Sequence, residues 1–254
     1  MQKILITGSS SLIATKLIKY LEKKEIEITC TLRSSEILPE LIGLKQIKQD
    51  LEEEFGDDFV SHVKASNILI HMAWIRPYQA RQSSSRNLAI MKRLMALNSN
   101  LKIVFVSSYK ANENSKSYYL KAKYVCEEAL SNGKHLIWKI PYVMSEPSIG
   151  PDIMLKKWLG KLPVSPKLIP SPELVSIDFD EMVEMMSENL NAIGRVNIGS
   201  QFAGGLNQLL FSPKKPAIYL PHRLLLLFFC FCASLFPSVG VFDKVITVLD
   251  YPPK

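Results

Sequence analysis

Near the start of this 254-residue chain stands Lys3-Ile4-Leu5-Ile6-Thr7-Gly8-Ser9-Ser10-Ser11-Leu12-Ile13-Ala14, an apolar run that meets one glycine and three serines. The run predicts a buried strand, and the small residues predict a tight turn into a helix. Backbone N–H groups at such a helix N-terminus bind the pyrophosphate of a dinucleotide. The turn therefore predicts cofactor contacts at Thr7, Gly8, Ser10, Ser11, Leu12 and Ile13.

Strand-like and helix-like segments alternate beyond this turn. Apolar strands are expected at residues 3–6, 27–32, 44–48, 68–73, 102–106 and 135–140, and amphipathic helices at 10–23, 88–97 and 118–130. Such alternation predicts an α/β fold, a Rossmann-like doubly wound parallel sheet. Right-handed crossovers bring all strand carboxyl ends to one edge, so ligand-binding residues are expected just after the strands.

The character of the chain changes near residue 145. Prolines then cluster, which indicates loops between short elements: Pro147, Pro151, Pro163, Pro166, Pro170 and Pro172. We expect residues 1–145 to form an NAD(P)-binding Rossmann domain. Residues 146–254 are expected to form a small substrate-binding lobe with an apolar C-terminal segment.

That apolar segment, residues 224–242, contains no charged residue. Its length approaches the roughly 17–25 residues that cross a bilayer, but Pro237 and Gly240 interrupt its last third. Three interpretations stay open: a helix buried in or docked on the lobe, a peripheral membrane contact, and a membrane span.

Composition narrows the class of protein. The net charge is +7, yet the lysines are dispersed and no nucleic-acid-binding motif is present, so nucleic acid is not an expected partner. The first residues lack the apolar length of a signal peptide. The four cysteines lie in apolar surroundings without metal-ligand spacing. We expect no metal and a cytoplasmic location, with membrane association through residues 224–242 as the alternative.

Tyr119 and Lys123 carry the strongest chemical signal. They are four residues apart and therefore share one helix face. A neighbouring cation favours phenolate, so this tyrosine can exchange a proton near neutral pH. The preceding strand ends in Ser107-Ser108, where the hydroxyl of Ser108 can hold a substrate oxygen beside Tyr119.

Further motifs occur along the chain in the same order as in one known family. They are the turn at residues 7–14, Asp50-Leu51, Ile70-His71-Met72-Ala73, Asn87, Ser108 with Tyr119 and Lys123, Lys139-Ile140-Pro141-Tyr142-Val143, Val175-Ser176-Ile177-Asp178 and Val196-Asn197-Ile198-Gly199. Over residues 3 to about 200 the chain resembles the extended short-chain dehydrogenases/reductases, the nucleotide-sugar-modifying NAD(P)-dependent epimerases and dehydratases. The resemblance implies a catalytic Ser108, Tyr119 and Lys123, with Lys123 also holding the cofactor ribose. It implies further cofactor contacts at Asp50, Leu51, His71, Met72, Ala73, Asn87 and Pro141.

The chain also departs from the family pattern. Ser11 and Ala14 stand where glycine is usual, and Tyr109-Lys110 replaces the Asp-Glu pair that sugar-nucleotide dehydratases use. The second of these differences counts against dehydration.

The second strand ends at Arg33-Ser34-Ser35 with no acidic residue to bind a ribose hydroxyl. Arg33 and Ser34 therefore favour the 2′-phosphate of NADP, with NAD as the alternative.

Together these features predict an NAD(P)-dependent epimerase or ketoreductase that acts on a nucleotide sugar, with Tyr119 as acid and base. The family implies surface-polysaccharide biosynthesis and a homodimer. Two alternatives stay open: a catalytically inert NADP-binding sensor or membrane-docked scaffold, and a ketoreductase for a non-sugar carbonyl. Trp74 is assigned to packing.

Overall fold

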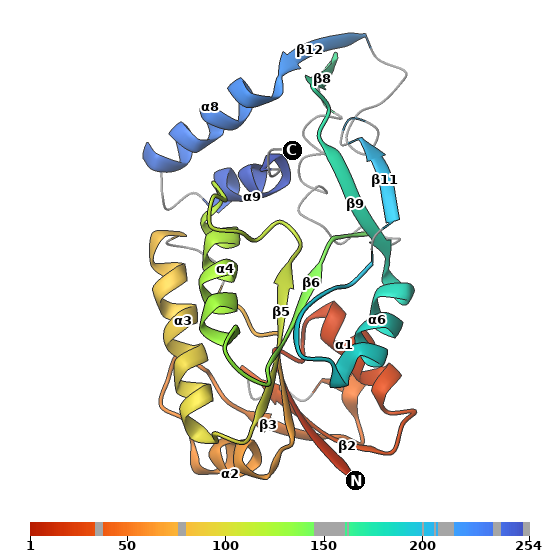
Figure 1. Cartoon of the computed structure of the whole chain (residues 1–254), viewed down its shortest axis with the longest axis vertical. Coiled ribbons are helices and arrows are strands. Elements are labelled where there is room, and N and C mark those ends of the chain that lie inside the picture. The colour runs from red at the N-terminus through yellow and green to blue at the C-terminus, as the bar shows by residue number, and fades with distance from the viewer. Residues whose placement is uncertain are drawn as a thin grey trace.

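Seven parallel strands form the large sheet of the computed structural model (Figure 1). Their spatial order is β10 (Gly194–Asn197), β6 (Leu136–Ile140), β5 (Lys102–Ser108), β4 (Ile68–His71), β1 (Gln2–Thr7), β2 (Ile26–Leu32) and β3 (Lys45–Lys48). The structure describes residues 1–33, 38–75, 80–144, 161, 163–199, 201–205, 207, 216–235 and 240–250.

The strand order reverses beside β1. The chain builds outward from β1 to β3 and then returns, so β4 pairs with the other edge of β1. Thr7 and His71 are register partners at the carboxyl ends of these two strands. In doubly wound sheets a ligand binds at such a switch point, because the loops there diverge and leave a crevice.

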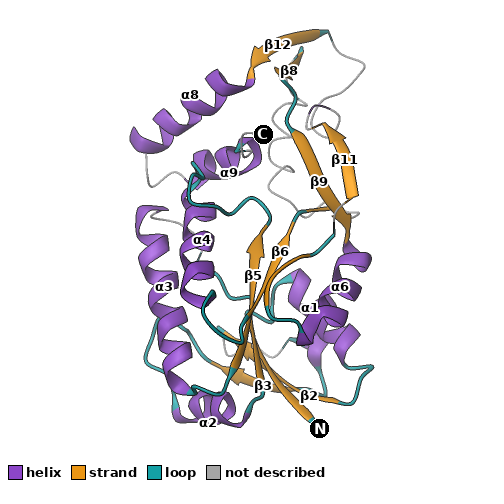
Figure 2. Ribbon diagram, viewed as in Figure 1, coloured by secondary structure: helices purple, strands orange, loops and turns teal. Residues whose placement is uncertain are grey.

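Helices cover both faces of the sheet (Figure 2). Apolar side chains of α1 (Leu12–Leu21) and α6 (Phe179–Glu188) join the core on one face. Those of α2 (Asp57–Ala65), α3 (Ala80–Leu97) and α4 (Tyr118–Leu130) join the core on the other. Each large apolar side chain buried there stabilises the fold by about 1.5–3 kcal/mol.

The predicted fold class is confirmed, and each predicted strand of the first 140 residues is present. The pattern missed α2 and the returning strand β10. It also placed the start of a helix at residue 88, whereas α3 begins at Ala80. The first turns of α3 carry Arg81-Gln82-Ser83-Ser84-Ser85-Arg86, and such polar residues give no apolar periodicity.

Beyond residue 145 the chain contributes to two regions. The elements α6, the 3₁₀ helix Asn189–Asn191 and β10 return to the large sheet, so residues 146–254 are more than a separate lobe. A second sheet has the order β11 (Gln201–Gly205), β9 (Glu173–Asp178) and β7 (Tyr142–Met144), and β12 (Ala217–Pro221) pairs with β8 (Ser165–Ile169). A further 3₁₀ helix spans Pro39–Leu41.

The apolar C-terminal segment is divided between α8 (His222–Leu235) and α9 (Gly240–Leu249). The helix α9 contacts both α8 and α4, and Figure 1 shows it between them. Among the described residues, every helix falls short of the length and apolar character needed to cross a bilayer.

Candidate functional site

The turn predicted to bind phosphate is built on close backbone approach. Gly8 adopts a φ of +72°, and a Cβ there would lie 2.5 Å from the backbone nitrogen of Ala73 and 2.8 Å from the carbonyl carbon of Met72. Only glycine fits this contact between the β1 and β4 loops. Ser11 caps α1, its hydroxyl accepting from the N–H of Ala14 at 3.3 Å. Ser11, which stands where the family usually has glycine, is thus the N-cap of α1.

A pocket opens at the switch point between β1 and β4. Its lining unites nine of the predicted cofactor residues: Thr7, Gly8, Ser10, Arg33, Asp50, Leu51, His71, Ala73 and Asn87. Residues that the sequence did not single out complete it: Thr31, Gln49, Glu52, Trp74, Ile75 and Ile90.

Some predicted cofactor residues do not line this pocket. Ser11, Leu12, Ile13, Met72, Lys123 and Pro141 are absent from its lining. The side chain of Leu12 is largely exposed, because the first turn of α1 faces solvent there. Ser34 lies outside the described residues.

Acidic side chains occupy the end of the pocket beside β2. Arg33 donates from Nε to the Asp50 carboxylate at 2.8 Å and lies 3.5 Å from Glu52 through its Nη2. Arg86 forms a second ion pair with Glu52. The sequence interpretation found no acid beside Arg33, because Asp50 and Glu52 follow the neighbouring strand β3 and only the sheet brings them together.

Tyr119 and Lys123 lie on α4 as the spacing predicts, and a third side chain joins them. The Lys123 ammonium lies 3.8 Å from the centroid of the Trp74 ring and 5.7 Å from that of Tyr119. Trp74 meets Tyr119 edge to face at 5.9 Å. Lys123 Nζ also donates to the carbonyl of Val106 at 2.7 Å. Trp74 therefore connects the pocket to the predicted catalytic pair.

Two buried polar atoms around the pocket have no hydrogen-bond partner in the described part of the chain. They are Nε1 of Trp74 and Oγ1 of Thr31. Such buried groups are costly to leave unpaired, and their presence in a pocket is typical of a ligand site. Together with the Gly8 turn, they fit a dinucleotide.

Lys123 gives the site a pH-dependent stability. Burial lowers the pKa of its ammonium from 10.5 to about 7. Between these values the unfolded chain holds more protons than the folded one, so stability rises with pH across that window. Urea unfolding should therefore show the wild type gaining stability relative to Lys123→Met between about pH 7 and pH 10. A difference in unfolding free energy between the two proteins that stays constant with pH would contradict this expectation.

His71 is a structural element of the pocket. It is buried, and its Nδ1 is 2.8 Å from Thr7 Oγ1. Burial and the charge of Lys123 lower the pKa of His71 to about 3. The imidazole is therefore neutral at physiological pH and joins the carboxyl ends of β1 and β4.

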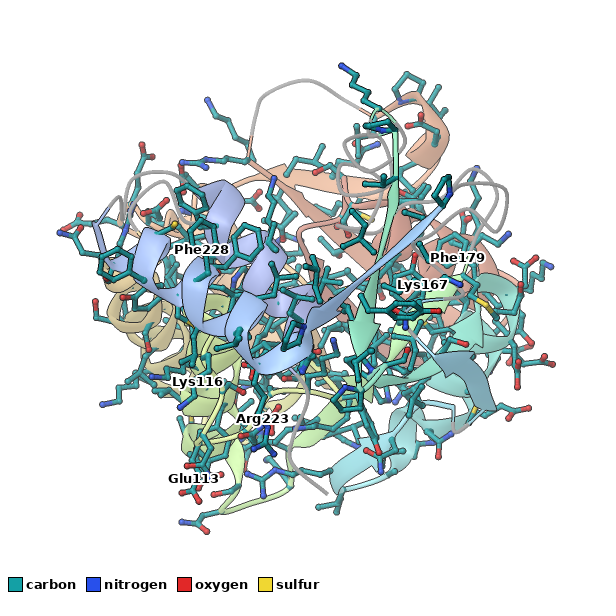
Figure 3. The ribbon with its side chains drawn as sticks, turned by 90° about the horizontal axis from the view of Figure 1, so that it is seen from above. Glu113, Lys116, Lys167, Phe179, Arg223 and Phe228 are labelled. Carbon is teal, nitrogen blue, oxygen red and sulfur yellow. The ribbon has the colours of Figure 1, made fainter. Side chains whose placement is uncertain are left out.

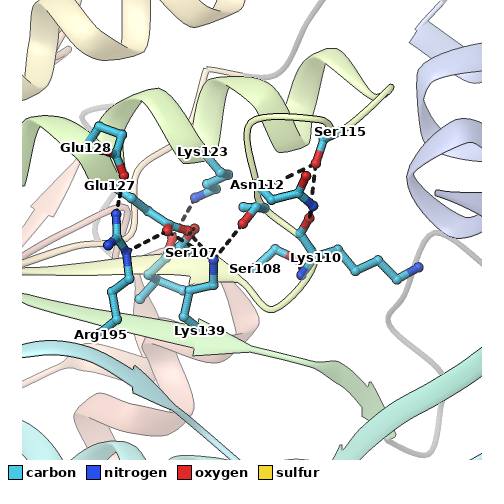
Figure 4. Close-up of polar contacts among 12 residues, drawn as sticks. Ser107, Ser108, Lys110, Asn112, Ser115, Lys123, Glu127, Glu128, Lys139 and Arg195 are labelled. Atoms are coloured by element: carbon cyan, nitrogen blue, oxygen red, sulfur yellow. Dashed lines mark hydrogen bonds and ion pairs between the residues drawn. The ribbon is translucent and has the colours of Figure 1, made fainter. Parts of the chain in front are cut away.

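The two serines at the end of β5 have different surroundings (Figure 4). Ser107 is buried and donates to the carboxylate of Glu127 on α4. Side chains alternate along a strand, so Ser108 lies on the opposite face of β5. Its hydroxyl accepts from the N–H of Lys110 at 3.4 Å. Unlike Ser107, Ser108 therefore lies outside the cluster of charged side chains around Glu127.

That cluster is a buried ionic centre beneath the site. Glu127 is fully buried, lies 3.0 Å from Lys139 Nζ and pairs with Nε of Arg195 at 3.3 Å. Lys139 is the lysine that replaces the arginine of the family motif. It also donates to the carbonyl of Ala111, in the loop that leads to α4. The cluster thus joins α4, β6, β10 and this loop.

Removing the buried carboxylate should be strongly destabilising. Glu127→Ala leaves Lys139 partly buried without its counter-ion, which typically costs about 3–5 kcal/mol. Glu128→Ala is the matched control, because Glu128 is exposed and pairs with Arg195 at the surface, worth about 1 kcal/mol or less. Urea unfolding measures both. Equal losses would show that the buried cluster contributes no more than a surface pair.

The C-terminal helix α9 caps the N-terminus of α4. Asp243 is buried, and its carboxylate accepts from the N–H of Tyr118 at 2.7 Å and of Tyr119 at 3.1 Å. Burial raises the pKa of Asp243, while these two N–H groups act in the opposite direction. The carboxylate thus holds the backbone of the predicted catalytic tyrosine.

More contacts join α9 to the loop before α4. Asp250 accepts from the N–H of Ser117 at 3.3 Å, and the hydroxyls of Ser117 and Thr247 are 2.7 Å apart. Lys110 donates to the carbonyls of Thr247 and Val248 at 3.1 and 3.0 Å. The sequence interpretation missed these residues, because more than 120 positions separate Asp243 from Tyr119.

Loss of the cap should lower stability measurably. Asp243→Ala removes both acceptors from the first turn of α4, and loss of a helix cap costs about 0.5–2 kcal/mol. Asp243→Asn keeps one acceptor oxygen and should cost less. Thermal unfolding of the three proteins checks this order. An alanine variant as stable as the wild type would mean that the cap adds nothing.

The fold has similar structures among solved proteins. Neither protein-family models nor curated protein sequences give a match. Solved structures do. The structure of gox2253 superposes with a TM-score of 0.70 at 17% identity, covering 99% of this chain and 90% of its own.

A short-chain dehydrogenase/reductase superfamily protein from Agrobacterium tumefaciens, solved with bound NAD, superposes with a TM-score of 0.64 at 16% identity over 87% of this chain and 85% of its own. The fold is that of the short-chain dehydrogenases/reductases. The UDP-glucose 4-epimerase of Thermotoga maritima, solved with UDP-glucose, matches with a TM-score of 0.62 at 17% identity over 87% of this chain and 86% of its own.

Proposed function

We propose that this protein is an NAD(P)-dependent epimerase or ketoreductase that acts on a nucleotide sugar. The observation that carries the proposal is the contact of Trp74 with both Tyr119 and Lys123. It joins the dinucleotide-type pocket at the β1–β4 switch point to an acid–base pair on α4. The superposed epimerase and the NAD-bound protein are in accord with this reaction class.

Each residue has a proposed role. The nicotinamide cofactor supplies hydride chemistry when bound. Tyr119 exchanges the proton of the reacting hydroxyl or carbonyl, and Ser108 holds the same oxygen. Lys123, while protonated, favours the phenolate of Tyr119 and binds the ribose. The turn at Gly8 and the N-terminus of α1 hold the pyrophosphate.

The choice between NADP and NAD depends on Arg33. A 2′-phosphate on Arg33 would share the guanidinium with Asp50 and Glu52, and two carboxylates beside a phosphate oppose it by charge repulsion. A 2′-hydroxyl could instead donate to Asp50. NADP is the proposed cofactor and NAD is the alternative. The ion pairs of Arg33 with Asp50 and Glu52 determine which of the two binds more tightly.

Titration of the purified protein with NADPH and with NADH, followed by nicotinamide fluorescence, tests the proposal first. Saturable binding of either should be followed by turnover in a screen of nucleotide sugars. Stronger binding of NADPH assigns the 2′-phosphate to Arg33, whereas stronger binding of NADH assigns the ribose to Asp50. Binding of neither cofactor overturns the enzyme proposal.

The wider setting is also proposed. Surface-polysaccharide biosynthesis in the cytoplasm suits a nucleotide-sugar substrate. The helices α3 and α4 pack side by side along one face of the sheet. They are the proposed surface of a homodimer, which measurement of the mass in solution tests.

A further inference from the structure

An apolar stripe lies on the outer side of α8. The side chains of Leu224, Leu227, Phe228 and Phe231 are 58–63% exposed. Their spacing of three and four residues places them on one face of the helix. Figure 3 shows Phe228 on α8 at the surface of the molecule. Ile218 and Tyr219, on the adjoining strand β12, are also exposed.

This stripe differs from the surface of an ordinary amphipathic helix. The opposite side of α8 already packs on α9, and His222 contacts the carbonyl of Leu249 at 2.7 Å. A helix covered on one side normally presents polar residues on the other. Here α8 carries apolar residues on both sides and Arg223 as its one formally charged residue. A contiguous exposed apolar surface of this kind marks an interaction site.

The charge of α8 and its adjoining strand favours an anionic partner. Residues 216–235 contain no aspartate or glutamate, and their one formally charged residue, Arg223, is exposed. Arg223 precedes Leu224 and lies at the border of the stripe, since successive helical residues are about 100° apart. A cation at the edge of an apolar helix face is the arrangement of helices that lie in the surface of anionic membranes.

A second copy of the chain suits this surface less well. A helix of 14 residues is about 21 Å long and presents a strip of roughly 200 Å². A stable interface buries about 800 Å² on each partner. A bilayer surface has no such requirement, because insertion of a few large side chains adds to the attraction of anionic lipids.

We propose that α8 docks on the surface of an anionic phospholipid bilayer. The helix lies parallel to the membrane, with Leu224, Leu227, Phe228 and Phe231 entering the boundary of the acyl chains. Arg223 contacts lipid phosphates at the edge of the stripe. This inference is independent of the proposed reaction, since none of these residues lines the cofactor pocket.

Co-sedimentation with vesicles tests the docking surface. One set is phosphatidylcholine alone, and the other is an equal mixture of phosphatidylcholine and phosphatidylglycerol. We expect the wild type to sediment with the mixed vesicles and at least about tenfold less with the neutral ones. The double variant Leu227→Gln with Phe231→Gln should lose at least about tenfold in affinity for the mixed vesicles, because two large apolar side chains no longer enter the lipid.

The matched control substitutes two exposed isoleucines elsewhere, Ile42→Gln with Ile193→Gln, and should bind like the wild type. Thermal unfolding confirms that both variants fold. Absence of binding, or equal binding to neutral vesicles, overturns the proposal. So does equal loss in both variants. A concentration-dependent dimer that the stripe variant alone abolishes would assign the stripe to a second copy instead.

Discussion

Tyr119→Phe should lower turnover by about 10²–10⁴-fold and leave the affinity for the nicotinamide cofactor unchanged. The substitution removes only the hydroxyl proposed to exchange the proton, and loss of a general acid–base group has an effect of this size. The aromatic ring remains to pack edge to face on Trp74. The measurement is steady-state turnover with the nucleotide sugar found by screening, beside fluorescence titration of the cofactor.

Tyr118→Phe is the matched control. Tyr118 occupies the preceding position, and its N–H also donates to Asp243. This variant should retain turnover, because the Tyr118 hydroxyl has no part in the proposed reaction. Unchanged turnover in Tyr119→Phe would remove the acid–base role. Cofactor binding without turnover of any nucleotide sugar or other carbonyl by the wild type would instead favour the inert sensor.

Gly8→Ala should abolish cofactor binding and destabilise the fold by about 2–5 kcal/mol. Two costs add. A side chain at φ +72° is strained, and its Cβ would lie 2.5 Å from the backbone nitrogen of Ala73, which cannot move as a flexible side chain does. The β1 and β4 loops must then separate, which opens the switch point where we propose that the pyrophosphate binds. Urea unfolding and cofactor titration measure the two effects.

Gly43→Ala separates these two costs. Gly43 has a φ of +98°, but a Cβ there meets nothing within 4 Å. Its substitution should cost only the backbone strain, about 1–2 kcal/mol, and leave cofactor binding intact. Equal destabilisation by the two substitutions would mean that the contact between the β1 and β4 loops has no energetic weight.

Local patterns predicted much of the fold. The parallel sheet follows from short apolar runs that alternate with helical periods, and α4 has its predicted bounds of residues 118–130. Tyr119 and Lys123 share a face because a helix repeats every 3.6 residues. Nothing beyond the spacing was needed. In contrast, α2 has an acidic start and few apolar residues, and the short strand β10 lies far from its partners in the sequence.

The candidate site was likewise predicted only in part. The residues at the carboxyl ends of strands, such as Thr7 and His71, could be expected together because parallel strands end at one edge. Trp74 could not be distinguished from a packing tryptophan, since its proposed role depends on its contact with Lys123 on α4. The charge at Arg33 was also misjudged, because Asp50 belongs to a neighbouring strand.

The sequence by itself determined the sheet class, the tight turn at Gly8 and the Tyr119–Lys123 pair. Each of these depends on residues within a few positions of one another, where backbone geometry sets the spacing. Only the tertiary structure decided that Asp243 caps α4, that Glu127 is buried among cations and that α8 presents an apolar stripe. These features depend on which distant surfaces pack together, and burial is a property of the whole fold.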